Sequence, residues 1–276
     1  MKNPLKFYFL IIIPIMLSCS SQPDEVMWEL VWADEFDGTG RPDSTKWNYD
    51  MGDGCPAVCG WGNNELQYYT DDTLNARLEN GNLVIEARQE ARGEKPYTST
   101  RLVSRGKAEW LYGRFEIRAQ LPTGKGTWPA IWMLPSENKY GTWPKSGEID
   151  IMEHVGYDPG VVHGTLHSEK YNHLKQTQKE GITRPGADIQ KNFHVYSIDW
   201  EPNQVTFMVD DSTYHRVDRV EGDDFAGWPF DRKFYMILNQ AVGGNWGGKE
   251  GVDPGIWPQR LLVDYVRVYQ HPGPQQ

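Results

Sequence analysis

The chain has 276 residues and a formal net charge of −10, with 28 glycines and 18 prolines. This composition disfavours a helical bundle, a coiled coil or a disordered chain, because glycine and proline interrupt helices while a hydrophobic share of 38% suffices for a core. The acidic balance argues against nucleic acid as a partner, since binding a polyanion requires a basic surface. Twelve tryptophans suggest indole faces that bind a ligand as well as pack.

The first segment is predicted to direct export. Residues 1–18 contain two lysines followed by an apolar run at 7–17, which is too short to span a bilayer and is typical of a signal peptide. Cys19 follows in a sequence similar to the lipidation site of bacterial lipoproteins, with ordinary cleavage after Ser20 as the alternative. Residues 20–27 form a short polar tether. We expect a bacterial cell-envelope protein, an outer-membrane lipoprotein that meets the membrane only through its lipid; secretion is the alternative.

The remaining two cysteines, Cys55 and Cys59, are expected to form a disulfide, because an exported chain matures in an oxidising compartment. Closing so short a loop contributes about 2 kcal/mol at most in the chain-entropy model. The bond would therefore fix a loop and not support the whole fold.

Apolar and polar residues alternate along several segments, and no helical periodicity recurs. At 112–121, for example, Phe115 and Ile117 share one face and Glu116 and Arg118 the other. The other predicted strands are 82–88, 193–200, 204–210, 234–239 and 261–269. Short strands joined by glycine and proline turns predict an antiparallel β-sandwich or barrel. We expect one domain over 28–270 and a disordered tail at 271–276.

Three acidic residues alternate with apolar ones in Ser-Gly-Glu-Ile-Asp-Ile-Met-Glu-His at 146–154. In a regular strand Glu148 and Asp150 share a face while Glu153 points the other way. A β-bulge near Met152 would turn Glu153 onto their face. Two glutamates so placed suit a retaining glycosidase, whose carboxyl groups lie about 5–5.5 Å apart. Crowding of like charges would also keep one carboxyl protonated near neutral pH.

These residues have structural interpretations as well. An acidic cluster also suits calcium, which prefers carboxylate ligands. Trp128 and Trp132 would lie on one face of an extended segment, where indoles can stack on sugar rings, but core packing is the ordinary role of a tryptophan. His163 and His167 could be a metal pair, yet in a strand we favour single polar contacts.

The chain resembles glycoside hydrolase family 16, in its laminarinase (endo-1,3-β-glucanase) branch. The 146–154 segment matches the family's bulged Glu-x-Asp-x-x-Glu signature. Further matching segments cover roughly residues 28–270 and are Trp32–Gly38, Gly60–Thr70, Tyr112–Glu116, Trp128–Pro135, Leu238–Trp246 and Val263–Tyr269. The resemblance implies an all-β, antiparallel jelly-roll sandwich with a concave substrate cleft, and a retaining mechanism. It makes Glu148 the nucleophile, Glu153 the general acid/base and Asp150 the residue that hydrogen-bonds the nucleophile.

The resemblance also implies substrate and metal contacts. The residues expected around the negative subsites are Asn48, Arg101, Trp128, Trp132, Trp143, His167, Asn239 and Trp246. Gln240 stands where an apolar residue is expected. No cofactor is implied for catalysis, but family members often bind a structural calcium ion, and the matching positions are Glu35, the carbonyl of Gly81 and Asp264. In a regular strand Asp264 points to the same face as Val266 and Val268. If that face is buried, the carboxylate would need a partner such as a metal or a capping hydrogen bond.

Three functions remain in comparison. The favoured one is endo-hydrolysis of internal β-1,3 bonds in neutral β-glucans by a monomer. A second is another specificity of the same fold, such as a mixed-linkage glucanase or an agarase; the acidic charge disfavours a sulphated galactan substrate. A third is a non-catalytic glucan-binding protein, which the intact set of three carboxylates disfavours.

Overall fold

The computed structural model describes residues 27–272. The expected signal peptide, the lipidated Cys19, nearly all of the tether and the end of the tail lie outside these residues. Within them no helix is long and apolar enough to cross a bilayer. The helical segments are single 3₁₀ turns: η1 (Cys59–Gly62), η2 (His173–Lys175) and η3 (Ala187–Gln190).

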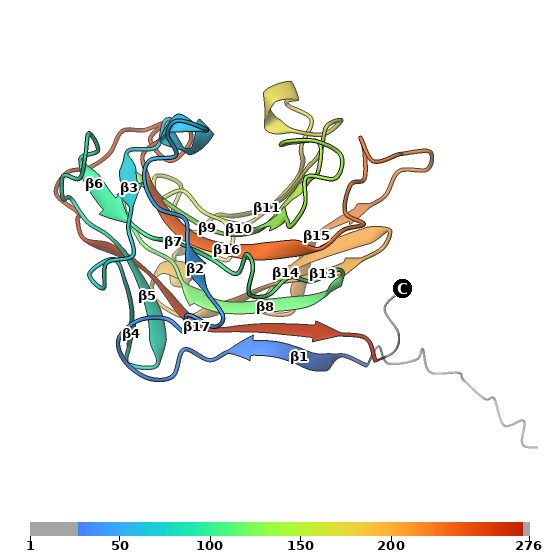
Figure 1. Ribbon diagram of the computed structural model, residues 1–276, viewed down its shortest axis with the longest axis horizontal. Helices are drawn as coiled ribbons and strands as arrows, with labels where there is room; N and C mark the ends of the chain where they lie inside the picture. Colours follow the sequence, from blue (N-terminus) through green and yellow to red (C-terminus); the bar gives the residue numbers. More distant parts are fainter. Residues whose placement is uncertain (1–26, 273–276) are drawn as a thin grey trace, which may run out of the picture.

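Two antiparallel sheets form a sandwich that is bent into a bowl (Figure 1). The concave sheet has the order β12 (Lys179–Thr183), β11 (Val162–His167), β10 (Glu148–Glu153), β9 (Thr127–Pro135), β16 (Phe234–Val242), β7 (Arg101–Val103), β2 (Asn48–Tyr49). The convex sheet has the order β15 (Ser212–Asp218), β14 (Gln204–Val209), β13 (His194–Glu201), β8 (Gly113–Gln120), β17 (Gln259–Gln270), β5 (Asn82–Ala87), β4 (Ala76–Glu79), and β1 (Glu29–Asp34) pairs with β17. A short parallel pair, β3 (Gln67–Tyr69) and β6 (Tyr97–Ser99), stands at one side of the bowl.

The core fills the space between the sheets. In β8 the predicted alternation holds along the whole strand, because Phe115 and Ile117 are fully buried while Glu116 and Arg118 are partly exposed. Phe115 and Ile117 pack in one hydrophobic core with buried residues of the concave sheet, such as Ile131. The predicted sandwich is therefore confirmed, and the six predicted strands correspond to β5, β8, β13, β14, β16 and β17 within a few residues.

Strand β9 lacked an alternation signal because it is covered on both faces. Its first five residues are all buried. One face packs on the core through Ile131 and the other contributes Trp128 to a separate cluster on the cleft side. Such a strand reads as a continuous apolar run, which sequence periodicity cannot separate from other buried structure.

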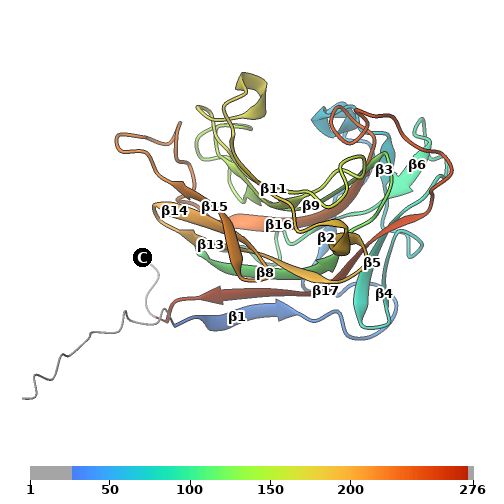
Figure 2. The ribbon, with the colours of Figure 1, turned by 180° about the vertical axis from the view of Figure 1, so that it is seen from behind.

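Walls rise above the concave sheet on two sides. In Figures 1 and 2 the blue 3₁₀ turn η1 and the yellow turn η2 face each other across the opening of the bowl. Cys55 and Cys59 form a disulfide, as expected, and η1 begins at Cys59. The crosslink thus closes the loop that leads into one wall.

Candidate active site

A bulge in β10 sets the direction of its three carboxylates. The pairing register shifts between Asp150 and Met152 on the β9 side, and between Asp150 and Glu153 on the β11 side. Ile151 and Met152 are consecutive, and both are buried in the core between the sheets. Since two successive side chains use the core face, Glu153 turns to the opposite face with Asp150. The irregularity expected near Met152 is therefore present.

Glu148 and Asp150 lie next to one imidazole. His167, which pairs with Glu148 across β10 and β11, has its Nε2 3.3 Å from Asp150 Oδ2 and 3.9 Å from Glu148 Oε1. Asp150 is 2% exposed, and its carboxyl is close enough to Glu148 for each to affect the pKa of the other. The His167 imidazole thus lies within 4 Å of both carboxylates.

Burial dominates the proton affinity of all three carboxyl groups. It raises the pKa of Glu148 well above its usual value, and the nearby charge of Asp150 raises it further. The pKa of Asp150 is also well above normal, through burial first and then the charge of Glu153. Burial raises the pKa of Glu153 too, but a hydrogen bond from Trp128 and the nearby His167 and His163 oppose it. One chain can therefore supply both a protonated and an ionised carboxyl near neutral pH.

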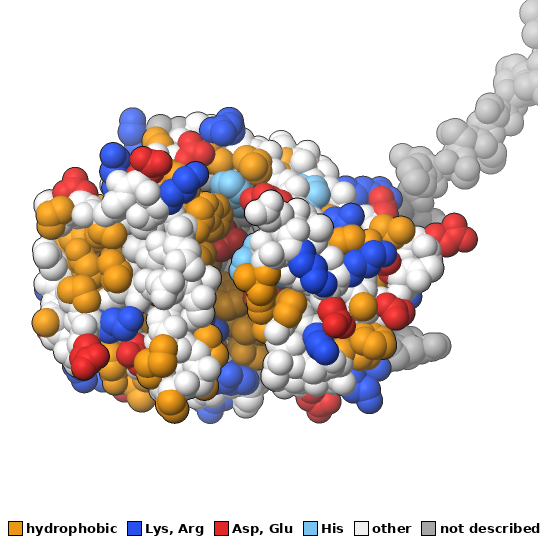
Figure 3. All heavy atoms as spheres, turned by 90° about the horizontal axis from the view of Figure 1, so that it is seen from above, with side chains coloured by type: hydrophobic (Ala, Val, Ile, Leu, Met, Phe, Trp, Pro, Cys, Tyr) orange, Lys and Arg blue, Asp and Glu red, His pale blue; other side chains and the backbone are white. Residues whose placement is uncertain are grey.

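Aromatic rings surround the acid cluster on the cleft side. Trp128 Nε1 donates to Glu153 Oε1 at 3.0 Å. The Trp128 ring meets Trp246 edge-on at 5.4 Å, and Trp143 lies 6.2 Å from the His167 ring. Figure 3, the view into the bowl, shows a groove whose floor carries acidic, histidine and hydrophobic side chains. Flat apolar faces beside carboxylates suit a sugar chain.

A second cluster lies on the η1 side of the groove. The guanidinium of Arg101 stacks between the rings of Trp61 and Trp132, 4.6 and 4.7 Å from their centroids. Asp50 pairs with Arg101 at 3.3 Å. Trp132 Nε1 donates to Asn239 Oδ1 at 2.7 Å. Arg101, Trp132 and Asn239 are thereby brought together, and their contact with a substrate stays a prediction.

Asn48 lies apart from this cluster. It is exposed on β2, the last strand of the concave sheet, and its amide donates to the carbonyl of Arg105 at 2.8 Å. Three strands separate it from β10. A contact between Asn48 and a sugar at the acid cluster would therefore require a substrate several units long.

Sequence reasoning missed three residues of the groove. Trp61 lies within the matching 60–70 segment but received no role, although it stacks on Arg101. His163 was interpreted only as a single polar contact. Its partner at 2.7 Å, Glu180, lies in no recognisable sequence motif and received no role. Neither could be recognised without the register that places β11 and β12 beside β10.

The two carboxylates expected at the calcium site are each paired with an arginine. Arg267 holds both oxygens of Glu35, at 2.9 and 2.8 Å, and Arg118 holds Asp264 at 2.5 Å. The inward orientation expected for Asp264 is wrong, because a bulge between Val263 and Tyr265 shifts the strand and leaves its side chain about one-third exposed. Gly81 forms the turn between β4 and β5. The calcium ion at these positions therefore stays a prediction.

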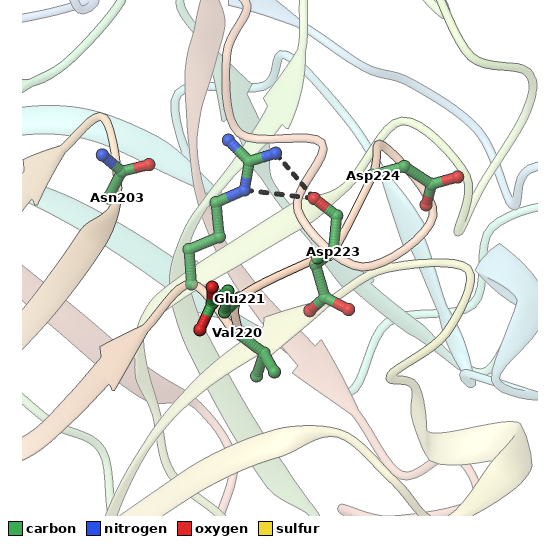
Figure 4. A pocket seen from close by; sticks show the side chains of 7 residues that line it. Asn203, Val220, Glu221, Asp223 and Asp224 are labelled. Carbon is green, nitrogen blue, oxygen red and sulfur yellow. Dashed lines mark hydrogen bonds between the residues drawn. The ribbon is translucent and has the colours of Figure 1, made fainter.

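A separate pocket lies beyond the end of β15 (Figure 4). Its volume is about 480 Å³, and Asn203 and the 219–224 segment line it. The polar groups there already have partners: Arg219 donates to the carbonyl of Asp223, and the Asp223 carboxylate accepts from Lys170 at 2.7 Å. The pocket contains neither an aromatic platform nor the carboxylates of β10, so we place the functional site in the groove.

Comparison with known proteins supports this placement. The model of Glycosyl hydrolases family 16 matches residues 57–267. The beta-glucanase of Rhodothermus marinus is 57% identical over 251 residues, which are 88% of this chain and 85% of that protein. The solved structure of the laminarinase from Rhodothermus marinus is 54% identical, with a TM-score of 0.86 over 90% of this chain and 99% of that one.

A second solved structure is a variant of SCLam, a non-specific endo-β-1,3(4)-glucanase, co-crystallised with 1,3-β-D-cellotriosyl-glucose. It is 47% identical, with a TM-score of 0.84, and covers 90% of this chain and 96% of that one. The match of the family model over most of the chain, together with these identities, shows that the protein belongs to glycoside hydrolase family 16.

Proposed function

We propose that this protein is a retaining endo-1,3-β-glucanase that cleaves internal bonds of laminarin-like glucans. The observation that carries the proposal is the bulge in β10, which places Glu148, Asp150 and Glu153 on the cleft face. The open groove admits a polymer along its length, as endo-action requires (Figure 3). The names of the similar enzymes, a beta-glucanase and a laminarinase, support β-glucan as the substrate class.

The proposed reaction is a double displacement that uses only side chains and needs no cofactor. Glu148 attacks the anomeric carbon while Glu153 gives its proton to the departing glycosidic oxygen, which leaves a glycosyl ester on Glu148. Glu153, now a carboxylate, takes a proton from water as the water oxygen attacks the same carbon and the ester bond breaks. Two inversions retain the configuration. Asp150 holds Glu148 in position and, through its charge, adjusts the nucleophile's proton affinity.

An assay of reducing ends released from laminarin, lichenan, agarose and carrageenan tests the substrate. We expect release from laminarin, with the β-anomer as the first product by proton NMR. Release from agarose without release from laminarin would reject the proposal in favour of the agarase alternative. No release from any of the four, with binding to laminarin, would favour a glucan-binding protein.

Substitution of the two glutamates tests the assigned roles. Glu148→Ala and Glu153→Ala are each expected to lower kcat on laminarin by at least about 10³-fold, because each removes a bond-making or proton-transferring group. Glu137→Ala, at an exposed glutamate next to β9, is the control and should behave like the wild type. A Glu148→Ala protein that retains full activity would show that the nucleophile is misassigned.

We also propose that the protein is exported as a monomeric lipoprotein anchored through Cys19. The lysines, the apolar run and the small residues around Cys19 support this. Labelling with radioactive palmitate in a bacterial host is expected for the full chain and should vanish in Cys19→Ala. Secretion of the unlabelled full chain would favour ordinary signal cleavage instead.

A further inference from the structure

A polar pair that the proposed reaction does not use lies beside Glu153. His163 on β11 is the cross-strand partner of Glu153, and residues opposite each other in antiparallel strands have Cβ atoms about 4.5–5.5 Å apart. The pairing follows from the bulge, since Asp150 pairs with Thr165 and the next pair towards the end of β10 is Glu153 with His163. The same irregularity thus turns Glu153 into the cleft and sets it against an imidazole.

Glu180 on β12 holds that imidazole in place. His163 Nδ1 lies 2.7 Å from Glu180 Oε1, and this hydrogen bond is the main cause that lowers the pKa of Glu180. Glu180 is therefore a carboxylate at neutral pH and accepts the bond, so Nδ1 of His163 carries a proton. Since His163 is only 8% exposed, its ring has little freedom, and Nε2 is the nitrogen that remains for other partners.

Two indoles complete the surroundings of Glu153. Trp246 lies edge-on to the His163 ring at 4.9 Å and to Trp128 at 5.4 Å. Trp128, on β9, donates its indole N–H to Glu153. Glu153 is therefore held by an indole on one neighbouring strand and faces an imidazole on the other.

The charged groups around Glu153 come from three strands. Its own strand contributes Glu148 and Asp150, whose pKa values Glu153 raises. On β11, His167 and His163 lower the pKa of Glu153, and on β12 the charge of Glu180 raises it. From β9 the contact is the uncharged indole of Trp128. The balance between His163 and Glu180 thus acts directly on a carboxyl that must gain and lose a proton in each cycle.

We propose that His163, oriented by Glu180, is a positioning residue for Glu153 that keeps this carboxyl in place to accept the proton of water in the second step. This inference rests on the proposed double displacement. In that step a water O–H bond breaks, its proton goes to Glu153, and the water oxygen bonds to the anomeric carbon as the ester to Glu148 breaks. A poorly held or still protonated Glu153 slows this step most.

The variant His163→Gln tests the inference on the full-length protein with laminarin. We expect kcat to fall roughly tenfold, a part of the about 10²–10⁴-fold that general acid–base catalysis contributes. KM should fall with kcat, because a slower second step lets the glycosyl ester accumulate. The alkaline limb of kcat/KM should move to higher pH, because Glu153 loses a group that lowers its pKa while the charge of Glu180 remains. A merely structural role would not move this limb.

A dinitrophenyl β-laminaribioside gives a second measurement. Its leaving group needs no proton, so the first step should stay fast in His163→Gln and the second should become limiting. We therefore expect a burst of dinitrophenolate equal to the enzyme concentration, followed by slow turnover. The wild type, whose second step is supported by His163, should show a smaller burst or none.

His194→Gln is the matched control, because His194 makes a similar pair with Asp210, Nδ1 to Oδ2 at 2.5 Å, on β13 of the convex sheet. It should keep the wild-type profile. If His163→Gln does not fold, Glu180→Gln removes the orienting charge instead and should show the same burst with a smaller loss of kcat. Folded variants at both positions with wild-type kcat, pH limb and burst would overturn the inference. An inactive wild type would instead contradict the proposed function.

Discussion

At the scale of single residues, Gln240 is a polar side chain that the fold does not use. It has the same parity in β16 as Leu238, which packs in the core between the sheets, whereas Asn239 between them bonds to Trp132 on the cleft side. Gln240 is fully buried, and neither amide atom has a hydrogen-bond partner among the described residues. The sequence had marked this position as unusual for its strand, and the structure shows why: the amide faces the core and not the substrate.

We therefore expect Gln240→Leu to raise the free energy of unfolding by about 1–2 kcal/mol, because it removes an unsatisfied buried amide. Urea denaturation followed by tryptophan fluorescence measures this, and activity on laminarin should not change. The control is Gln67→Leu: Gln67 is equally buried, but it donates to Glu65 and accepts from the backbone N–H of Val242. That variant should lose stability. A loss at Gln240 as well would mean that its amide has a partner.

Asp150 is also a buried polar residue, but unlike Gln240 it lies in the site and acts on Glu148. Its charge is one of the causes that raise the pKa of Glu148. Glu148 must be ionised to attack, so activity is lost as the pH falls through its pKa, and this fall forms the acidic limb of kcat/KM. Asp150→Asn removes the negative neighbour, so the pKa of Glu148 falls and the acidic limb should move to lower pH.

The same Asp150→Asn variant should have a lower kcat at neutral pH, since the nucleophile loses the side chain that orients it. A pH profile of kcat/KM on laminarin measures both effects. An acidic limb that stays in place, or moves to higher pH, would show that the charge of Asp150 does not act on Glu148.

At the scale of elements, the sequence predicted strands better than their irregularities. Alternation identified β8 and the acidic strand correctly, because a half-buried strand repeats every two residues. It gave the wrong direction for Asp264, because the bulge in β17 depends on how that strand pairs with β8. For β10 the bulge was expected only because the chemistry needed it. Bulges are set by neighbouring strands, and those neighbours are not adjacent in sequence.

The bulge in β10 makes Met152 the residue on which the position of Glu153 depends. Met152→Ala opens a cavity in the core and is expected to lower the free energy of unfolding by about 2–5 kcal/mol. It should also lower kcat, because the bulge loses the side chain that holds it against the core. Ile149→Ala, in the same strand but before the bulge, removes a similarly buried side chain. It should lose similar stability and much less kcat, by denaturation and laminarin assays.

Equal losses of kcat in the two variants would show that the strand as a whole, and not its bulge, positions Glu153. An intact kcat in Met152→Ala, together with the expected loss of stability, would show that pairing with β9 and β11 is sufficient to hold the irregular conformation.

At the scale of the whole molecule, the carboxylates of β10 differ in their partners from the buried carboxylate of the convex sheet. On the convex sheet, Arg77 and Arg260 pair with the buried Glu86. In the groove, the carboxylates of β10 meet imidazoles and an indole N–H instead. This arrangement leaves the groove without an excess of positive charge to attract a polyanion, although the sequence alone indicated only the overall acidic balance.

The net charge of −10 should therefore leave catalysis on a neutral glucan almost independent of salt. Between about 20 and 200 mM NaCl the Debye length falls from roughly 20 to 7 Å, which screens long-range forces between charges but not contacts with an uncharged sugar. We expect kcat/KM on laminarin to change by less than about twofold over this range. On carboxymethylated laminarin it should rise with salt, because repulsion between the acidic protein and the anionic polymer is screened. A steep fall with salt on either polymer would indicate a positively charged subsite that attracts anionic sugars.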